Sequence, residues 1–321
     1  MKDKEFKGLT LVQGRLLDAR QELTKRVWGE EPKLYNHAVL CSVGLPYRDQ
    51  KEERSFQRIS GATSLRMEAG ALPDGSGGFE EVGLPFGPRA RLLLLHLCSL
   101  AVKTNSPIVE VEDSFTGFAR SLGLSTTGRN LRTLREQVRR MSVVSMRLSR
   151  DYGEFVDVFQ GPIFSKLRAT YSDDPDQREL WPSFVEFSPE FYESLKNHAV
   201  PLRVEAIGAL KHSSRALDIY AWLASRLWRV KRPTTLKWTT MRFQFGNPTI
   251  GMGGFKRAFL TALKQVLLVY PEADVSIGKR GITIRRSPPP VRFAKSGPKP
   301  KLFFDTARSC AKNSSGGGKS S

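Results

Sequence analysis

Basic and short polar side chains share one face of a predicted helix near the middle of the chain. Arg132, Arg135 and Arg139 are spaced by three and four residues, which places them on one side of a helix over 129–141. Arg binds phosphate and can bond both O6 and N7 of guanine, whereas Asn can bond N6 and N7 of adenine. The first turn adds further groups of suitable chemistry: Thr127, Arg129, Asn130 and Thr133. This pattern predicts a helix that enters the major groove of DNA by its N-terminal end, and a solvated arginine face is the alternative.

A second helix, predicted over 255–270, shows the same division between an apolar and a basic face. Its apolar residues fall at helical spacing: Phe255, Phe259, Leu263, Val266 and Tyr270. Its polar residues fall on other faces: Lys256, Arg257, Thr261 and Lys264. Lys279 and Arg280 follow at the tip of a predicted hairpin, where basic side chains suit phosphate or minor-groove contact. A solvated turn is the alternative interpretation of that tip.

Residues for catalysis or metal binding are sparse and scattered. The histidines stand singly, and the three cysteines (Cys41, Cys98 and Cys310) lie far apart without a C-x-x-C pair. A nicking or strand-transfer enzyme could use a tyrosine such as Tyr152 or Tyr220, but the chain lacks the histidine pair that would hold its metal. We therefore expect a protein that is not an enzyme and needs no metal or cofactor.

The elements that position the first basic helix have the order of a helix-turn-helix with a wing. We predict that these elements form a first winged-helix domain over 83–165. Its predicted parts are a buried helix over 88–103, a strand over 108–112, a helix from Ser114, a turn over 124–128, the helix over 129–141 and a hairpin of 143–148 with 155–159.

The same order of elements recurs in a second winged-helix domain predicted over 201–287. Its parts are a helix over 213–229, a strand over 236–239, a short helix or turn over 241–245, a flexible joint at 251–254, the helix over 255–270 and a hairpin of 275–277 with 282–284. The distance from the start of the first helix to the hairpin turn is 64 residues in one unit (89 to 153) and 66 in the other (213 to 279). Chance seldom reproduces both order and spacing, so the repeat supports both assignments.

The remaining segments complete an α+β architecture of tandem winged-helix domains. Residues 1–82 are predicted to hold a helix over 16–27 and strands over 37–43 and 63–68, before a glycine-rich boundary over 74–78. Residues 166–200 are expected to connect the two units. Residues 288–321 are rich in Pro, Lys, Gly and Ser, and we expect this basic tail to be disordered.

The charge of the chain predicts a polyanionic partner. Lys and Arg number 51 against 32 Asp and Glu, which gives a net charge of +19. The longest apolar run, 92–102, is shorter than the roughly 20 residues that span a bilayer, so nucleic acid is favoured over membrane. Residues 1–7 lack a hydrophobic signal region, and we expect a bacterial cytoplasmic protein.

Four stretches of the sequence resemble the RepA-type replication initiators encoded by plasmids of proteobacteria. They are 45–48 (LPYR), 58–70 (RISGATSLRMEAG), 83–102 (GLPFGPRARLLLLHLCSLAV) and 118–141, which contains Leu134-Arg135-Glu136-Gln137. The resemblance implies binding to repeated double-stranded origin DNA, local duplex opening and recruitment of host replication proteins, among them the host initiator and helicase. Both a monomer and a homodimer remain open.

These observations together predict a plasmid replication initiator with two winged-helix domains. A winged-helix transcriptional repressor without a replication role is the first alternative, since it would use the same scaffold. A basic RNA-binding or architectural protein is a further alternative, and it would show little sequence preference.

Overall fold

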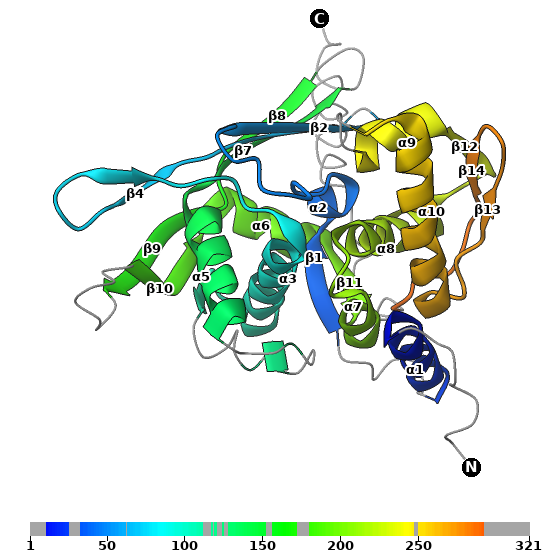
Figure 1. The fold of residues 1–321 in the computed structure, drawn as a ribbon, viewed down its shortest axis with the longest axis horizontal. Helices are drawn as coiled ribbons and strands as arrows, with labels where there is room; N and C mark the ends of the chain where they lie inside the picture. Colours follow the sequence, from blue (N-terminus) through cyan, green and yellow to red (C-terminus); the bar gives the residue numbers. More distant parts are fainter. Residues whose placement is uncertain are drawn as a thin grey trace, which may run out of the picture.

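The computed structural model describes residues 11–25, 33–61, 63–111, 117, 119–120, 124, 128–151, 156–171, 180–246 and 250–291. Helices and small antiparallel sheets alternate along this part of the chain (Figure 1), which confirms the α+β class. The helices are α1 (Leu11–Lys25), α2 (Ala38–Ser42), α3 (Gly87–Thr104), α5 (Gly128–Val143), α6 (Pro189–His198), α7 (Val204–Leu210), α8 (Ser214–Arg226), the 3₁₀ turn η1 (Leu227–Arg229), α9 (Trp238–Phe245) and α10 (Met252–Val269).

Two three-stranded sheets have the same topology. The first consists of β6 (Ile108–Glu110), β10 (Leu180–Phe187) and β9 (Phe164–Tyr171), in that spatial order. The second consists of β12 (Thr234–Lys237), β14 (Gly281–Ile284) and β13 (Val275–Ile277). In both sheets the last strand in the chain lies between the other two, and all pairs are antiparallel. The sheets lie toward opposite ends of the molecule (Figure 1).

The hairpin expected to be the first wing belongs to a different sheet. Its strands, β7 (Ser145–Asp151) and β8 (Val156–Pro162), extend a sheet of order β2-β3-β7-β8 that also contains β2 (Ser55–Ser60) and β3 (Thr63–Glu68). The hairpin of the first unit's own sheet is β9–β10, which lies in the segment expected to be a connector. Alternating hydrophobicity locates a strand but does not say which strand it pairs with, because pairing is set by distant residues.

The segment 37–43 forms mainly a helix, where the sequence predicted a strand. The strand β1 (Lys33–His37) pairs with β11 (Ala199–Arg203) and ends where α2 begins. The His37 ring accepts the backbone N–H of Val39 at 3.2 Å and so caps α2. Residues Ala38–Cys41 are all buried, and a short apolar run buried on every side has no period that separates helix from strand.

Three predicted irregular segments are also more ordered than expected. Gly253 and Gly254 lie inside α10 and not in a flexible joint. The glycine-rich stretch 74–78 is the turn of a hairpin formed by β4 (Ala71–Pro73) and β5 (Phe79–Glu81). Beyond β14 the chain packs on the second unit as far as Val291, which is fully buried, so the predicted tail cannot begin at 288. Residues 292–321 lie outside the described residues.

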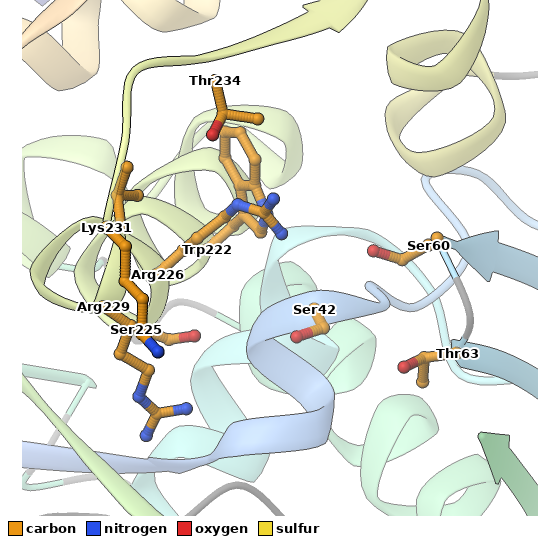
Figure 2. A pocket seen from close by; sticks show the side chains of 11 residues that line it. Ser42, Ser60, Thr63, Trp222, Ser225, Arg226, Arg229, Lys231 and Thr234 are labelled. Carbon is orange, nitrogen blue, oxygen red and sulfur yellow. The ribbon is translucent and has the colours of Figure 1, made fainter. Parts of the chain in front are cut away.

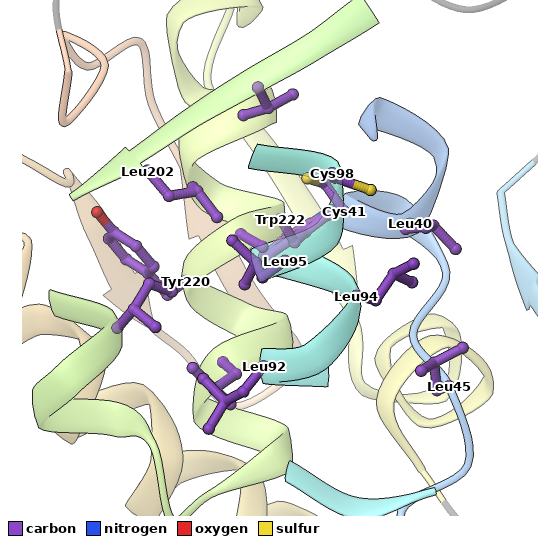
Figure 3. Packing of buried hydrophobic residues seen from close by; sticks show 14 of the residues in the cluster. Leu40, Cys41, Leu45, Leu92, Leu94, Leu95, Cys98, Leu202, Tyr220 and Trp222 are labelled. Atoms are coloured by element: carbon purple, nitrogen blue, oxygen red, sulfur yellow. The ribbon is translucent and has the colours of Figure 1, made fainter. Parts of the chain in front are cut away.

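One continuous hydrophobic core joins the two units, and α3 and α8 lie at its centre (Figure 3). The predicted burial of α3 on nearly all sides is confirmed, because twelve of its eighteen residues are buried. Cys41 and Cys98 are buried free thiols, and burial raises the pKa of each. Trp222 and Trp238 are 2 % and 6 % exposed, so they pack in the core and are not available to stack on bases. Trp181 and Cys310 fall outside the part whose side chains are described.

A buried ion pair, the Arg91–Asp218 pair, joins α3 to α8. Its two hydrogen bonds measure 2.6 Å (Nε to Oδ1) and 2.8 Å (Nη2 to Oδ2). The other guanidinium hydrogens bond the carbonyl oxygens of Leu45, Pro46 and Gly87. A β-carbon at position 44 would lie 2.1 Å from Oδ2 of Asp218, so only glycine fits there. Gly44, the adjoining resemblance motif 45–48 (LPYR) and the start of the motif over 83–102 therefore form the joint between the units.

Candidate nucleic-acid interface

The helix α5 presents a basic outer face because its inner face is apolar. Leu134, Val138 and Met141 are 6 %, 2 % and 1 % exposed, as the spacing predicted. On the outer side, Arg132, Thr133 and Arg135 are exposed. Thr127 lies outside the described residues, as does the side chain of Arg129. The structure thus brings at least three of the predicted DNA contacts of α5 to one surface.

The first turn of α5 lies beside Arg89, a basic residue of α3 that is not among the predicted DNA contacts. The Arg89 Nη2 donates a hydrogen bond to Oδ1 of Asn130 at 3.5 Å. Burial lowers the pKa of Arg89 but leaves it a cation at neutral pH. The signal available in the sequence was an Arg in the first turn of a mainly apolar helix. Arg89 and Asn130 together place a charge and a carboxamide at the N-terminal end of α5.

Arg139 does not join this outer face, contrary to the expectation from its spacing. Its guanidinium forms ion pairs with Glu80 of β5 and, at 3.7 Å, with Glu136 of its own helix. Only 13 % of its side chain is exposed. The hairpin β4–β5, which periodicity on α5 alone cannot reveal, covers this side of the helix. Arg139 consequently helps to hold α5 in place.

The helix α10 is divided into two faces as predicted. Its inner residues are at most 1 % exposed: Phe255, Phe259, Leu263, Val266 and Tyr270. Arg257, Thr261 and Lys264 are exposed on the other side. The Thr261 hydroxyl donates to the carbonyl oxygen of Arg257 at 2.9 Å, so its methyl group and remaining lone pair are what a ligand would meet.

The hairpin tip of the second unit lies next to the start of α9. Trp238 donates its backbone N–H to the carbonyl oxygen of Arg280 (3.1 Å) and its indole N–H to that of Gly278 (3.3 Å). The Lys256 ammonium lies 5.4 Å from the centre of the same indole ring. A β-carbon at position 281 would meet the Leu236 carbonyl oxygen at 1.8 Å, so glycine is required where the tip closes. Lys279 and Arg280 are both exposed beyond this support.

Two further observations bear on the nicking-enzyme and membrane alternatives. Tyr220 is fully buried, burial raises its pKa, and its hydroxyl accepts the backbone N–H of Arg203 at 3.2 Å. It cannot reach a DNA phosphate, which removes one candidate nucleophile, while Tyr152 lies outside the described residues. Within the described part of the chain, no helix is long and apolar enough to cross a membrane.

The comparisons with known proteins relate the middle of the chain to one family. Residues 84–240 match the family described as "Plasmid encoded RepA protein". Over this region, which is slightly less than half of the chain, the protein is similar to that family. The match covers the apolar helix α3 and the Leu-Arg-Glu-Gln segment of α5, so the resemblance stated from those residues is confirmed. RepA-family proteins are DNA-binding replication proteins and not enzymes. No curated protein sequence matches the chain.

One solved structure shares the fold at low sequence identity, and a second aligns less well. A selenomethionine derivative of domains 2 and 3 of RctB aligns with a TM-score of 0.52 and 12 % identity, over 78 % of this chain and 98 % of that one. A second structure of RctB domains 2–3 aligns with a TM-score of 0.47 and 11 % identity, over 77 % and 94 %. The first alignment covers most of the chain, so the fold is one that a solved structure also shows.

Proposed function

We propose that this protein, which is similar to the RepA family over 84–240, is a plasmid replication initiator that binds repeated origin DNA through two winged-helix units. The observation that carries the proposal is the shared strand order of the sheets β6-β10-β9 and β12-β14-β13. A basic helix precedes the second strand of each sheet in the chain, as the recognition helix does in a winged helix. We accordingly propose units over 83–187 and 201–287, with β9–β10 and β13–β14 as their wings.

The exposed residues have distinct proposed roles. Arg132, Arg135, Arg257 and Lys264 contact phosphates or guanine, and Lys279 and Arg280 contact phosphates beside the second helix. Asn130 and Thr133 read base edges at the start of α5, and Thr261 contributes a methyl group suited to thymine. Thr127 and Arg129 keep the roles predicted from their positions in the first turn. Bound initiators would open the origin and recruit the host initiator and helicase, as the family resemblance implies.

A replication assay tests the initiator function directly. A marked DNA circle without an origin is joined to this gene and its flanking sequence, and a frameshifted copy serves as the control. Maintenance that depends on the intact gene supports an initiator and locates its origin nearby. If both circles are lost although the protein is expressed, a repressor that uses the same scaffold becomes the better interpretation.

Binding measurements separate affinity from sequence reading. We expect Arg132→Ala to weaken binding to every duplex by about 1–3 kcal/mol and to lower the salt dependence by about one ion, because it removes a phosphate contact. Asn130→Ala should reduce the preference for the site at one base position. Lys103→Ala, an exposed cation at the far end of α3, is the matched control. An Asn130 variant that discriminates between sites as well as the wild type contradicts the base-reading role.

A further inference from the structure

A polar pocket lies between the second unit and the N-terminal segment that holds α2, β2 and β3, away from α5 and the second wing. It is a cavity of about 380 Å³ formed where α8, η1 and β12 approach α2 and the turn between β2 and β3. This volume lies within the range of small-ligand pockets, roughly 300–1,000 Å³. The residues that line it are Ser42, Ser60, Gly61, Thr63, Trp222, Ser225, Arg226, Arg229, Val230, Lys231 and Thr234.

The lining combines three cations with hydroxyl groups and includes no carboxylate. Arg226, Arg229 and Lys231 lie on one side, and the hydroxyls of Ser60 and Thr63 point toward them from the other side (Figure 2). Cations that line a cleft of one sign focus their field and attract anions. Planar guanidinium groups and hydroxyls are also the donors that suit the oxygens of a phosphate.

Arg226 lies beside an aromatic ring of the pocket. Its guanidinium carbon lies 5.9 Å from the centre of the buried Trp222 ring. Desolvation lowers the pKa of Arg226, yet the side chain stays charged at neutral pH. Since Arg226 is also exposed, its charge is accessible to an anion that enters the pocket from solvent.

The pocket is distinct from the proposed DNA surface of the second unit. In the β12–β14 ladder, Lys237 pairs with Gly281 at the wing tip, whereas Thr234 pairs with Ile284 at the opposite end. The pocket therefore lies about 10 Å from the tip along the strand, by the rise of a β-strand. The residues that line it include none from α5 or α10.

We propose that this pocket is a phosphate-binding site that takes the phosphates of a free nucleotide or of a nucleic-acid strand. The arginines and lysine neutralise the phosphate charge, and the hydroxyls of Ser60 and Thr63 donate to its oxygens from the facing turn. One wall comes from α2 and the turn between β2 and β3, and the other from α8, η1 and β12. A bound phosphate therefore also bridges the N-terminal segment and the second unit.

Calorimetric titration of the full-length protein at constant ionic strength tests the proposal. The probes are inorganic phosphate, ATP and a short oligo-dT strand. The variants are Arg226→Gln/Lys231→Gln and a control with equal charge loss, Lys103→Gln/Arg120→Gln, at exposed positions outside the pocket. Lys231→Gln alone, at an exposed position, serves if the double variant does not fold.

We expect saturable binding by the wild type, about tenfold weaker in the pocket variant and within about twofold in the control. Binding of phosphate or ATP identifies a free nucleotide as the source, whereas binding of the strand alone identifies a nucleic-acid backbone. Absence of saturable binding by all three probes overturns the proposal, as does an equal loss in both double variants. Either result leaves the replication assay unaffected, so this proposal and the proposed initiator function fail separately.

Discussion

The two units share a strand order but hold their basic helices by different means. In the first unit, polar contacts from the preceding segment reach α5: Gln137 accepts the backbone N–H of Phe86 at 2.8 Å, and Arg140 donates to Asp49 at 2.9 Å. In the second unit, α10 is held by aromatic packing. Phe259 lies 5.6 Å from Phe245, 5.7 Å from Phe255 and 6.0 Å from Trp238 between ring centres.

This difference follows from what surrounds each unit. The aromatic cluster that supports the second basic helix comes from its own unit, although α1 from the N-terminal segment also packs against α10. The first depends on residues before its unit, since Asp49 and Glu80 precede α3 and hold Arg140 and Arg139. A polar support needs each donor and acceptor to be matched, whereas an apolar support needs only volume and shape. Both helices bury an apolar inner face. Beyond that shared packing, the first helix should be sensitive to the loss of single hydrogen bonds, and the second to the loss of aromatic volume.

The largest effect is expected at the centre of the aromatic support. Phe259→Ala should lower the free energy of unfolding by about 3–5 kcal/mol, because Phe259 is fully buried and the deletion leaves a cavity. Denaturant titration measures the change. Phe243→Ala, at a residue of α9 that is 71 % exposed, is the matched control and should change stability little. Equal losses in the two variants would contradict the role assigned to the aromatic cluster.

An intermediate effect is expected from the polar support of α5. Gln137→Met keeps a similar volume but removes the acceptor of the Phe86 N–H, so we expect a loss of about 1–3 kcal/mol. Arg132→Met on the exposed face of the same helix controls for helix propensity, which is similar for Arg and Met. If Gln137→Met leaves stability unchanged or raises it, this support is apolar in character and the comparison between the units fails.

The smallest effect is expected at the surface end of this support, and it depends on pH. Partial burial raises the pKa of Asp49, but hydrogen bonds from Arg140 and the N–H of Lys51 outweigh it, so the pKa lies below its ordinary value. A carboxyl whose pKa is lower in the folded state stabilises the fold at neutral pH and loses that contribution as acid protonates it. Asp49→Asn should cost less than about 1 kcal/mol at pH 7.

Denaturation of the Asp49→Asn variant and the wild type at pH 7 and at pH 3 measures this contribution. The difference in unfolding free energy should shrink at the lower pH, because the wild-type carboxyl is then partly protonated. An equal difference at both pH values would show that the hydrogen bonds of Asp49, and not its charge, support α5.

Local patterns in the sequence predicted the elements that carry their own period. The helices α3, α5, α8 and α10 and the strand β3 all occur where they were expected, because their apolar residues repeat at 3.6 or 2 positions over several turns or pairs. The face of α10 with Arg257 and Lys264 was predictable for the same reason. These features need no knowledge of distant residues.

The features that depend on distant residues were not predictable in this way. The hairpin β7–β8 reads as a wing until its pairing with β3 is known. The hairpin β9–β10 reads as part of a connector because the acidic stretch 173–176 lies between its strands. Arg139 matches the spacing of Arg132 and Arg135, yet Glu80 of a separate hairpin engages it. Whether a charge on a helix faces solvent or a partner is decided by packing that its own helix does not encode.

The Arg91–Asp218 pair has a consequence for the layout of a binding site. Twisting α3 against α8 would separate a buried carboxylate from its guanidinium, which is costly in an environment without water. The angle between the two basic helices is thus set by the protein. If both helices bind DNA as proposed, the DNA must present its two contacted segments at the matching phase. Inserting five base pairs between those segments turns one of them by about half a helical turn. Origins that this protein recognises should therefore tolerate changes of base between the segments far better than changes of spacing.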